Sequence, residues 1–465
     1  VISLADVPRF CVGEIRISSM LWRGFGLLLS RKKKHDIVHI HGPVPTFSDL
    51  SLLLTALGRK ARHLKTKAPL IVYTHHSEID LPGCRQLCDV YNRGHKLLAR
   101  LADQVIVETP AYARRLTEYV PSERVSVVPC GTDQWQPHAE LPKAERFSVL
   151  FVGQLRPYKG LETLLAAAAG LDGTELHIVG SGHRERHYRN LAAAPGLEHV
   201  TFHGRLSEDE LQRRYAEAHV LVLPSNTKAE AFGLVLLEGM IAGCVPVASQ
   251  LPGVMDVVGN VGLTFPVDDE IALRESLRRL RDDGELRRSL ALRARERGRT
   301  FTWPRMVHWH RAVYERLLAL RRFDQALRGS HLQSALRRLI ADSLPAIGAS
   351  AGYIKISTGG TASQTVEASV ELSEEPGDKS SSLAVPIAVH RGLLGVLTVS
   401  RDTDRQFSDY EIQWLTSLAQ RLGSALVRGG YVPGGHLPTD LDPPPPPDRQ
   451  HQQAVWREDV WPNVA

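Results

Sequence analysis

Residues 229–239, AEAFGLVLLEG, carry the pattern that decides the fold. Seven residues, mostly apolar, separate Glu230 from Glu238, and core packing alone does not explain two carboxylates at that spacing. Residues 224–227 are typical of a strand end that passes into a loop, and the stretch from Gly233 onward is typical of a helix. We therefore expect Glu230 just ahead of a helix N-terminus and Glu238 about one and a half turns into that helix.

This placement predicts the kind of ligand. Free backbone N–H groups at a helix N-terminus bind phosphate. One carboxylate at the helix start and another farther along would contact hydroxyl groups on both sides of that phosphate, as in a nucleotide sugar. In the alternative reading Glu230 is only a favourable charge at the helix N-terminus, worth about 0.3–1 kcal/mol. That reading leaves Glu238, Lys159 and the glycines at 180 and 182 unexplained.

The composition is that of an ordinary globular protein with several domains. The chain has 465 residues, of which 43% are hydrophobic and 23% charged. No apolar run approaches the ~20 residues that span a bilayer, and no signal peptide is evident. The five cysteines are scattered. Cys84 and Cys88 have the spacing of a metal pair, but without a second pair we expect free thiols in a reduced cytoplasm.

Positive charge gathers near the start of the chain. The net charge is +6, and two basic runs occupy residues 31–35 and 59–67, the first of them preceded by Trp22 and Phe25. These runs are either solvated loop ends or part of an amphipathic surface that contacts anionic lipid at the inner membrane face. We do not expect nucleic acid as a partner, because no binding motif accompanies the charge.

Two series of short β-branched stretches alternate with helical ones and predict two α/β, Rossmann-like domains, at residues 1–140 and 141–325. Ligands gather at the carboxyl ends of such strands, where His41 and His76 fall. We expect His39 and His41 to face opposite ways, and likewise His75 and His76. The predicted strands are at 36–41, 70–76, 104–109 and 125–129, then at 148–153, 175–180, 200–204, 220–223 and 245–248.

A third unit is expected at residues 328–428. It would have a helix at 332–344, strands at 351–356, 383–387 and 394–399, and a helix at 408–427. Residues 357–382 are interpreted as a polar stretch. Residues 429–465 include five consecutive prolines and are predicted to be a disordered tail.

Residues 153–160, GQLRPYKG, follow the first strand of the second domain and open a helix. Arg156 and Lys159 can offer positive charge to a pyrophosphate. Gly180 and Gly182, after the next strand, let a ligand approach the backbone. The glycines alone are weak evidence, but together with Lys159 and the paired glutamates they form a specific pattern.

In this order and spacing the motifs resemble the retaining, nucleotide-sugar-dependent glycosyltransferases of family 4, which have the GT-B fold of two facing Rossmann-like domains. The likeness covers about residues 36–320. It implies a retaining hexosyltransferase that takes a nucleoside-diphosphate sugar as donor and needs no metal or other cofactor. The motifs that carry it lie at residues 41–43, 74–77, 129–133, 151–160, 177–182, 223–238, 243–247 and 262–266.

The resemblance also implies a role for individual residues. Glu230 would hold hydroxyls of the donor sugar, and Lys159 would stabilise charge on the departing diphosphate. His76 would lie by the sugar near the reaction centre. Glu238 would bind the ribose, and Arg156 would substitute for the arginine that the family commonly has where this chain has Gln154. The other implied substrate-binding residues are Gly153, Gly180, Gly182, Phe232, Gly233 and Leu234.

The sequence departs from the family pattern at two places. The usual Gly-Gly-x-x-Glu is Pro252-Gly253-Val254-Met255-Asp256 here, which provides a shorter acid. Residues 1–35 lack the expected front strand and Gly-rich loop, so we expect an N-terminally incomplete first domain and an incomplete acceptor site. The departures motivate a rival hypothesis, a non-catalytic nucleotide-sugar-binding protein that regulates through its third unit.

The third unit resembles a GAF domain, chiefly at residues 384–387, 392–397 and 407–409. The resemblance implies either a small-molecule sensor or a docking and homodimerisation module, and we favour the second. The acceptor stays open between a polysaccharide, a lipid-linked molecule and a small molecule.

Overall fold

The fold is that of a computed structural model, which describes residues 9–12, 15–18, 35–45, 47–62, 69–80, 83–132, 142–327, 331–358, 364–372, 381–389 and 392–431. The described residues form two compact units. One runs up to Val120 and includes Val127–Val307, and the other joins Pro121–Ser126 to the chain from His308 onward. No helix in these ranges is long and apolar enough to cross a membrane.

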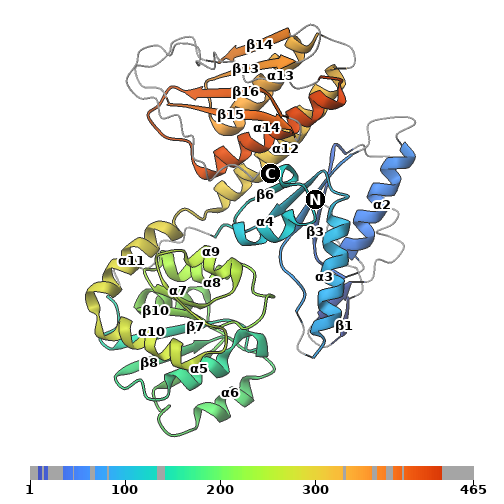
Figure 1. The fold of residues 1–465 in the computed structure, drawn as a ribbon. Coiled ribbons are helices and arrows are strands. Elements are labelled where there is room, and N and C mark those ends of the chain that lie inside the picture. Colours follow the sequence, from blue (N-terminus) through green and yellow to red (C-terminus); the bar gives the residue numbers. More distant parts are fainter. Residues whose placement is uncertain are drawn as a thin grey trace. The chain divides into compact units, whose positions relative to one another are not determined.

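The first Rossmann-like domain is built on a four-stranded sheet of order β3-β4-β5-β6. Strands β3, β4 and β5 run parallel, and β5 is buried along its whole length, as expected where helices cover both faces. Figure 1 shows these elements in blue and teal. They are β3 (Ile37–Gly42), α2 (Phe47–Arg62), β4 (Leu70–His75), α3 (Arg85–Ala99), β5 (Gln104–Val107), α4 (Pro110–Thr117) and β6 (Val125–Val127).

The region before residue 35, predicted to lack the front strand and Gly-rich loop of the family, contains two short strands that the sequence analysis did not predict. Two short strands, β1 (Arg9–Val12) and β2 (Ile15–Ser18), pair antiparallel as a separate sheet. Within the described residues neither strand joins the four-stranded sheet. The two strands therefore do not replace the front strand that the family pattern leads us to expect.

The second Rossmann-like domain has a six-stranded parallel sheet of order β12-β11-β10-β7-β8-β9. The chain adds strands outward on one side of β7 and then returns to add β10 to β12 on the other side. The switch point therefore lies between β7 and β10, where ligands bind in such sheets. The strands are β7 (Phe147–Val152), β8 (Thr174–Val179), β9 (Val200–Gly204), β10 (Val220–Leu223), β11 (Val245–Ser249) and β12 (Leu263–Phe265).

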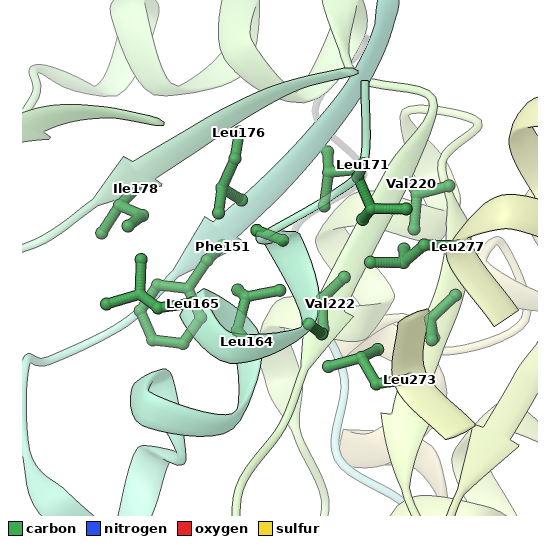
Figure 2. Packing of buried hydrophobic residues seen from close by; sticks show 14 of the residues in the cluster. Phe151, Leu164, Leu165, Leu171, Leu176, Ile178, Val220, Val222, Leu273 and Leu277 are labelled. Atoms are coloured by element: carbon green, nitrogen blue, oxygen red, sulfur yellow. The ribbon is translucent and has the colours of Figure 1, made fainter. Parts of the chain in front are cut away.

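Helices bury both faces of this sheet. Along β7, Val149 and Phe151 belong to one hydrophobic cluster, whereas Leu150 belongs to another. Figure 2 shows the first cluster, in which Phe151 lies among leucines from α5 and Leu277 comes from α10. Burial of each such side chain contributes about 1.5–3 kcal/mol to the stability of the fold. The packed core therefore holds the ends of the strands in fixed positions. The helices are α5 (Leu161–Ala168), α6 (Glu185–Ala192), α7 (Glu208–Glu217), α8 (Leu234–Ile241), α9 (Pro252–Val258), α10 (Glu270–Asp282) and α11 (Gly284–Gly298).

After α12 (Trp303–Ala326) comes an antiparallel sheet of order β14-β13-β16-β15. Residues of α13 and α14 pack with Ile354, Leu397 and Val399, so both helices cover one face of the sheet. This is the predicted α+β third unit. Its elements are α13 (Leu332–Ser343), β13 (Ala351–Thr358), β14 (Gln364–Glu371), β15 (Ser381–Val389), β16 (Gly392–Arg401) and α14 (Asp409–Arg428).

The polar stretch at residues 357–382 contains a strand, β14, that the sequence analysis did not predict. In β14 the polar side chains of Thr365, Glu367 and Ser369 are exposed and alternate with Val366, Ala368 and Val370. Only Ala368 of the three is fully buried, which leaves a weak apolar signal. The predicted disordered tail lies outside the described residues beyond 431.

Candidate functional site

A cavity of about 580 Å³ opens where β7, β8 and β9 end in the second Rossmann-like domain. Four predicted binding residues line it: Gly153 and Arg156 after β7, and Gly180 and Gly182 after β8. Its other lining residues are Val152, Gln154, Val179, Ser181, His183, Arg205, Leu206 and Leu211.

Glycine is needed here for the backbone itself. A Cβ on Gly180, whose φ is +134°, would lie 1.9 Å from the carbonyl oxygen of Gly153, and a Cβ on Gly182 would lie 2.3 Å from that of Leu155. The loops after β7 and β8 therefore touch and shape one side of the cavity. The predicted approach of a ligand to these glycines stays a prediction.

The cavity favours an anion. Among the described residues, Arg156, His183 and Arg205 line it, and no carboxylate does. Fixed positive charge in a concave site attracts anionic ligands. Our prediction missed His183 and Arg205, although Arg205 directly follows the last residue of β9 and so stands at a strand end, where ligands gather.

Lys159 and Glu230 form an ion pair beside this region. The Lys159 ammonium contacts Glu230 Oε2, which also accepts a hydrogen bond of 3.0 Å from Ser225 Oγ. The two charged side chains are only 12% and 13% exposed. The sequence predicts both residues as ligand contacts but does not predict that they pair with each other.

A close backbone contact brings Lys159 to Glu230. At Gly160, with φ +65°, an added Cβ would lie 1.9 Å from the carbonyl oxygen of Pro224. Nearby, Asn226 N donates to the carbonyl oxygen of Tyr158 at 2.9 Å. The segment carrying Lys159 is thus fixed against the loop that follows β10, at the switch point of the sheet.

Glu238 lies inside α8, as predicted, and is held by a residue that sequence reasoning missed. It accepts a hydrogen bond of 2.6 Å from the hydroxyl of Tyr215, which is fully buried in α7. Burial raises the pKa of Glu238, and the Tyr215 hydrogen bond opposes that rise. One turn earlier on α7, Leu211 lines the cavity. Glu238, Lys159 and Glu230 are not among its lining residues.

The three residues at the start of α8 have different surroundings. Phe232 is 4% exposed and belongs to a core cluster, and Gly233 caps the helix in the left-handed conformation. Leu234, the first helical residue, is exposed. Their predicted contact with sugar or phosphate involves backbone amides, and these stand where the sequence places them, at the helix start.

His76 follows β4 in the first domain. Its Nδ1 lies 2.6 Å from Glu108 Oε1, and its Nε2 lies 2.9 Å from His41 Nδ1. The His76 side chain is 44% exposed, whereas His75 is buried, so these neighbours do face opposite ways. Glu108 was not predicted.

The prediction that His39 and His41 face opposite ways is wrong. Their rings stack with centroids 4.3 Å apart. Residues two apart on a strand share a face, because side chains alternate with a period of two. The His39 Nε2 lies 2.7 Å from Thr74 Oγ1, so His39 is tied to β4.

Asp256, the shorter acid, is engaged with the first domain. Its Oδ2 accepts a hydrogen bond of 2.6 Å from the backbone N–H of Ala111, in the first turn of α4. A carboxylate at a helix N-terminus is favourable there. Within the described residues, no group of three or more His, Cys, Asp or Glu is arranged to hold a metal ion.

The sequence matches the models of three protein families. The family described as "Glycosyl transferases group 1" matches residues 133–297, and a "Glycosyl transferase 4-like domain" matches residues 5–131. The group 1 match covers the second Rossmann-like domain, and the 4-like match covers the first. A GAF domain matches residues 270–426. The predicted family, GT-B fold and GAF-like unit are therefore confirmed.

Individual relatives agree with this family. D-rhamnosyltransferase WbpZ of Pseudomonas aeruginosa is 30% identical over 52% of this chain and 63% of its own length. A GDP-mannose-dependent α-(1-6)-phosphatidylinositol monomannoside mannosyltransferase of Mycobacterium tuberculosis is 32% identical over 46% of this chain and 60% of its own. The chain thus spans under two thirds of either relative. Sucrose-phosphate synthase of Thermosynechococcus elongatus has a TM-score of 0.52 at 26% identity, covering 64% of this chain and 76% of that structure.

Proposed function

We propose that this group 1 glycosyl transferase moves a sugar from a nucleoside-diphosphate sugar to an acceptor with retention at the anomeric carbon. The observation that carries the proposal is the Lys159–Glu230 pair, which lies at the switch point of the second domain beside a basic cavity. The names of the relatives, which include rhamnosyl- and mannosyltransferases and a GDP-mannose-dependent enzyme, support the reaction class.

In the proposed complex the nucleotide occupies the cavity. Arg156 and Arg205 then face its phosphates, and Glu238, held by Tyr215, binds the ribose hydroxyls. The diphosphate draws the Lys159 ammonium toward itself, which frees the Glu230 carboxylate to accept hydrogen bonds from the sugar. These positive charges take the role that a metal ion has in other enzymes, so we propose a metal-free reaction.

The chemical step exchanges one bond at the anomeric carbon for another. The bond from that carbon to the diphosphate oxygen breaks, and the acceptor oxygen bonds to the same face of the sugar. The acceptor proton passes to the departing diphosphate, whose growing charge Lys159 stabilises. His76, oriented by Glu108, lies by the sugar near the reaction centre in this proposal.

We also propose that the first domain contacts an anionic membrane surface. Leu53 and Leu57 on α2 are exposed, and the basic run at 59–67 begins on the same helix. Exposed Leu87, Val90 and Leu97 follow one stripe of α3. Apolar and basic side chains together favour anionic lipid. This surface favours a lipid-linked acceptor over a polysaccharide or a small molecule, at the inner face of the membrane.

For the GAF-like unit we propose docking or homodimerisation. The space between α13, α14 and the sheet is lined by apolar side chains and measures only about 10 Å³, roughly the room of one water molecule. This packing speaks against a sensor that binds its ligand there. The rival function, a non-catalytic regulatory protein, rests on the missing front strand of the first domain and on the shorter acid at Asp256 in the second.

Equilibrium binding and turnover of labelled nucleotide sugars test the proposed function. The 465-residue protein should bind at least one nucleoside-diphosphate sugar, and Glu238→Ala should weaken that binding about tenfold. Arg213→Met, which removes an exposed ion pair with Asp209, should leave it unchanged. The rival function predicts binding without transfer. If no donor binds and Glu238→Ala has no effect, both the proposed function and the rival function are wrong.

A further inference from the structure

The segment that carries Glu230 is held from two sides. Within its own domain, Asn226, Lys159 and Ser225 make the contacts described above. The other side is formed by the first Rossmann-like domain, which belongs to the same compact unit. Its contacts converge on Lys228, two residues before Glu230.

Three groups of the first domain reach Lys228. Its backbone N–H donates to Asp80 Oδ2 at 3.3 Å, and its carbonyl oxygen accepts from the Tyr112 hydroxyl at 3.1 Å. Its ammonium lies 3.9 Å from Glu78 Oε2. Backbone donor, backbone acceptor and side chain are thus all engaged by one domain.

Other charged side chains hold the Glu78 carboxylate in a fixed position. It is 4% exposed, and Oε1 lies 2.5 Å from the Lys96 ammonium. Its second oxygen lies 3.4 Å from Arg115 Nη1. A buried carboxylate requires such partners, so Glu78 cannot follow Lys228 if the segment moves.

The Tyr112 side chain is also held in a fixed position. It is 3% exposed in α4, and burial raises the pKa of its hydroxyl, which therefore stays protonated and able to donate. In contrast, the Lys228 side chain is 42% exposed. The buried groups, Glu78 and Tyr112, thus belong to the first domain. They hold the second domain in place through their contacts with Lys228.

We infer that Lys228 is a positioning residue that sets the place of Glu230 by anchoring residues 227–231 to the first domain. Lys228 acts through Glu230 and needs no contact with the donor. Without the anchor, the segment would have to be ordered when the donor binds, and that ordering costs affinity. The catalytic consequence rests on the proposed function, whereas the anchoring rests on the contacts alone.

Amide hydrogen exchange and donor kinetics on the full chain test this inference. In Lys228→Met, which leaves Glu78 paired with Lys96 and Arg115, the amides of residues 225–232 should exchange about threefold faster, and the donor KM should rise by a similar factor with little change in kcat. Lys228→Arg should restore both values. Tyr112→Phe should act in the same direction as Lys228→Met.

The control is Arg213→Met, which removes an exposed ion pair on α7 and should change neither quantity at residues 225–232. Exchange and KM in Lys228→Met that equal those of the unsubstituted protein would overturn the inference. If the protein transfers no sugar, the proposed function and the KM effect both fail, but the exchange rates still decide whether Lys228 anchors the segment.

Discussion

The two Rossmann-like domains carry different kinds of side chain at the ends of their strands. In the second domain, arginines line a cavity and Lys159 pairs with Glu230. In the first, the strand ends carry imidazoles that contact one another, with His76 between His41 and Glu108. Fixed charges suit a permanently anionic ligand, whereas imidazoles suit a site where protons or neutral groups are handled. This contrast supports the proposal that the second domain binds the donor and that the first provides the acceptor side.

Lys159→Met should have the largest effect on this division. Loss of one preorganised charge at the departing group typically lowers kcat about 10²–10³-fold, and here Glu230 also loses its partner. Turnover with a labelled donor measures the effect. Lys355→Met, which removes the Lys355–Glu367 pair of the GAF-like unit, is the matched control. A fall below tenfold would contradict the role of Lys159.

Glu108→Gln tests the other half of the comparison. It keeps the shape of the side chain but removes the charge that orients His76, so kcat should fall about tenfold, the value of a single hydrogen bond to a charged group. The donor Kd should stay unchanged, because the second domain binds the donor. A weaker donor Kd with unaltered kcat would reverse the assignment of the two domains.

Tyr215→Phe should have a smaller effect, confined to donor affinity. Loss of the hydrogen bond to Glu238 should raise the donor Kd about fivefold. That hydrogen bond lowers the pKa of Glu238, so its loss raises the pKa further. Calorimetry across pH should show donor affinity that is present above the Glu238 pKa and lost as pH falls, with the loss beginning at higher pH in the variant. Identical pH profiles would exclude Glu238 as the ribose contact.

The smallest effect concerns stability in acid. Burial, with Arg287 and Lys143 nearby, lowers the pKa of His219 to about 4, and its Nδ1 accepts from Ser148 N at 3.1 Å. The unfolded chain binds this proton near pH 6.5, so the His219 contribution is present above pH 6.5 and lost as pH falls toward 4. Its slope stays well below about 1.4 kcal/mol per pH unit, because the ring is partly exposed.

Thermal melts between pH 7.5 and 4.5 measure this slope. The Tm of the unsubstituted protein should fall more steeply with acid than the Tm of His219→Gln, whose amide can also accept from Ser148. Equal slopes would show that His219 does not titrate on unfolding.

Local patterns in the sequence were enough to predict most strands and the positions of Glu230 and Glu238. Both depend on periodicity and helix-start signals, which are local along the chain. The partners of these residues were not predictable in that way. Tyr215 reaches Glu238, and Glu108 reaches His76, only after distant segments pack together. Strand β14 was missed because, of its side chains that the structure describes, only Ala368 is fully buried and the apolar signal is weak.

A crystal structure of the protein with an intact nucleoside-diphosphate sugar tests the central claim most directly. The account predicts the nucleotide in the cavity between Arg156 and Arg205, and the Lys159 ammonium within hydrogen-bond distance of the diphosphate. Sugar hydroxyls should lie on Glu230, and the ribose on Glu238. A nucleotide bound elsewhere, or a Lys159–Glu230 pair that stays closed with the donor in place, would contradict it.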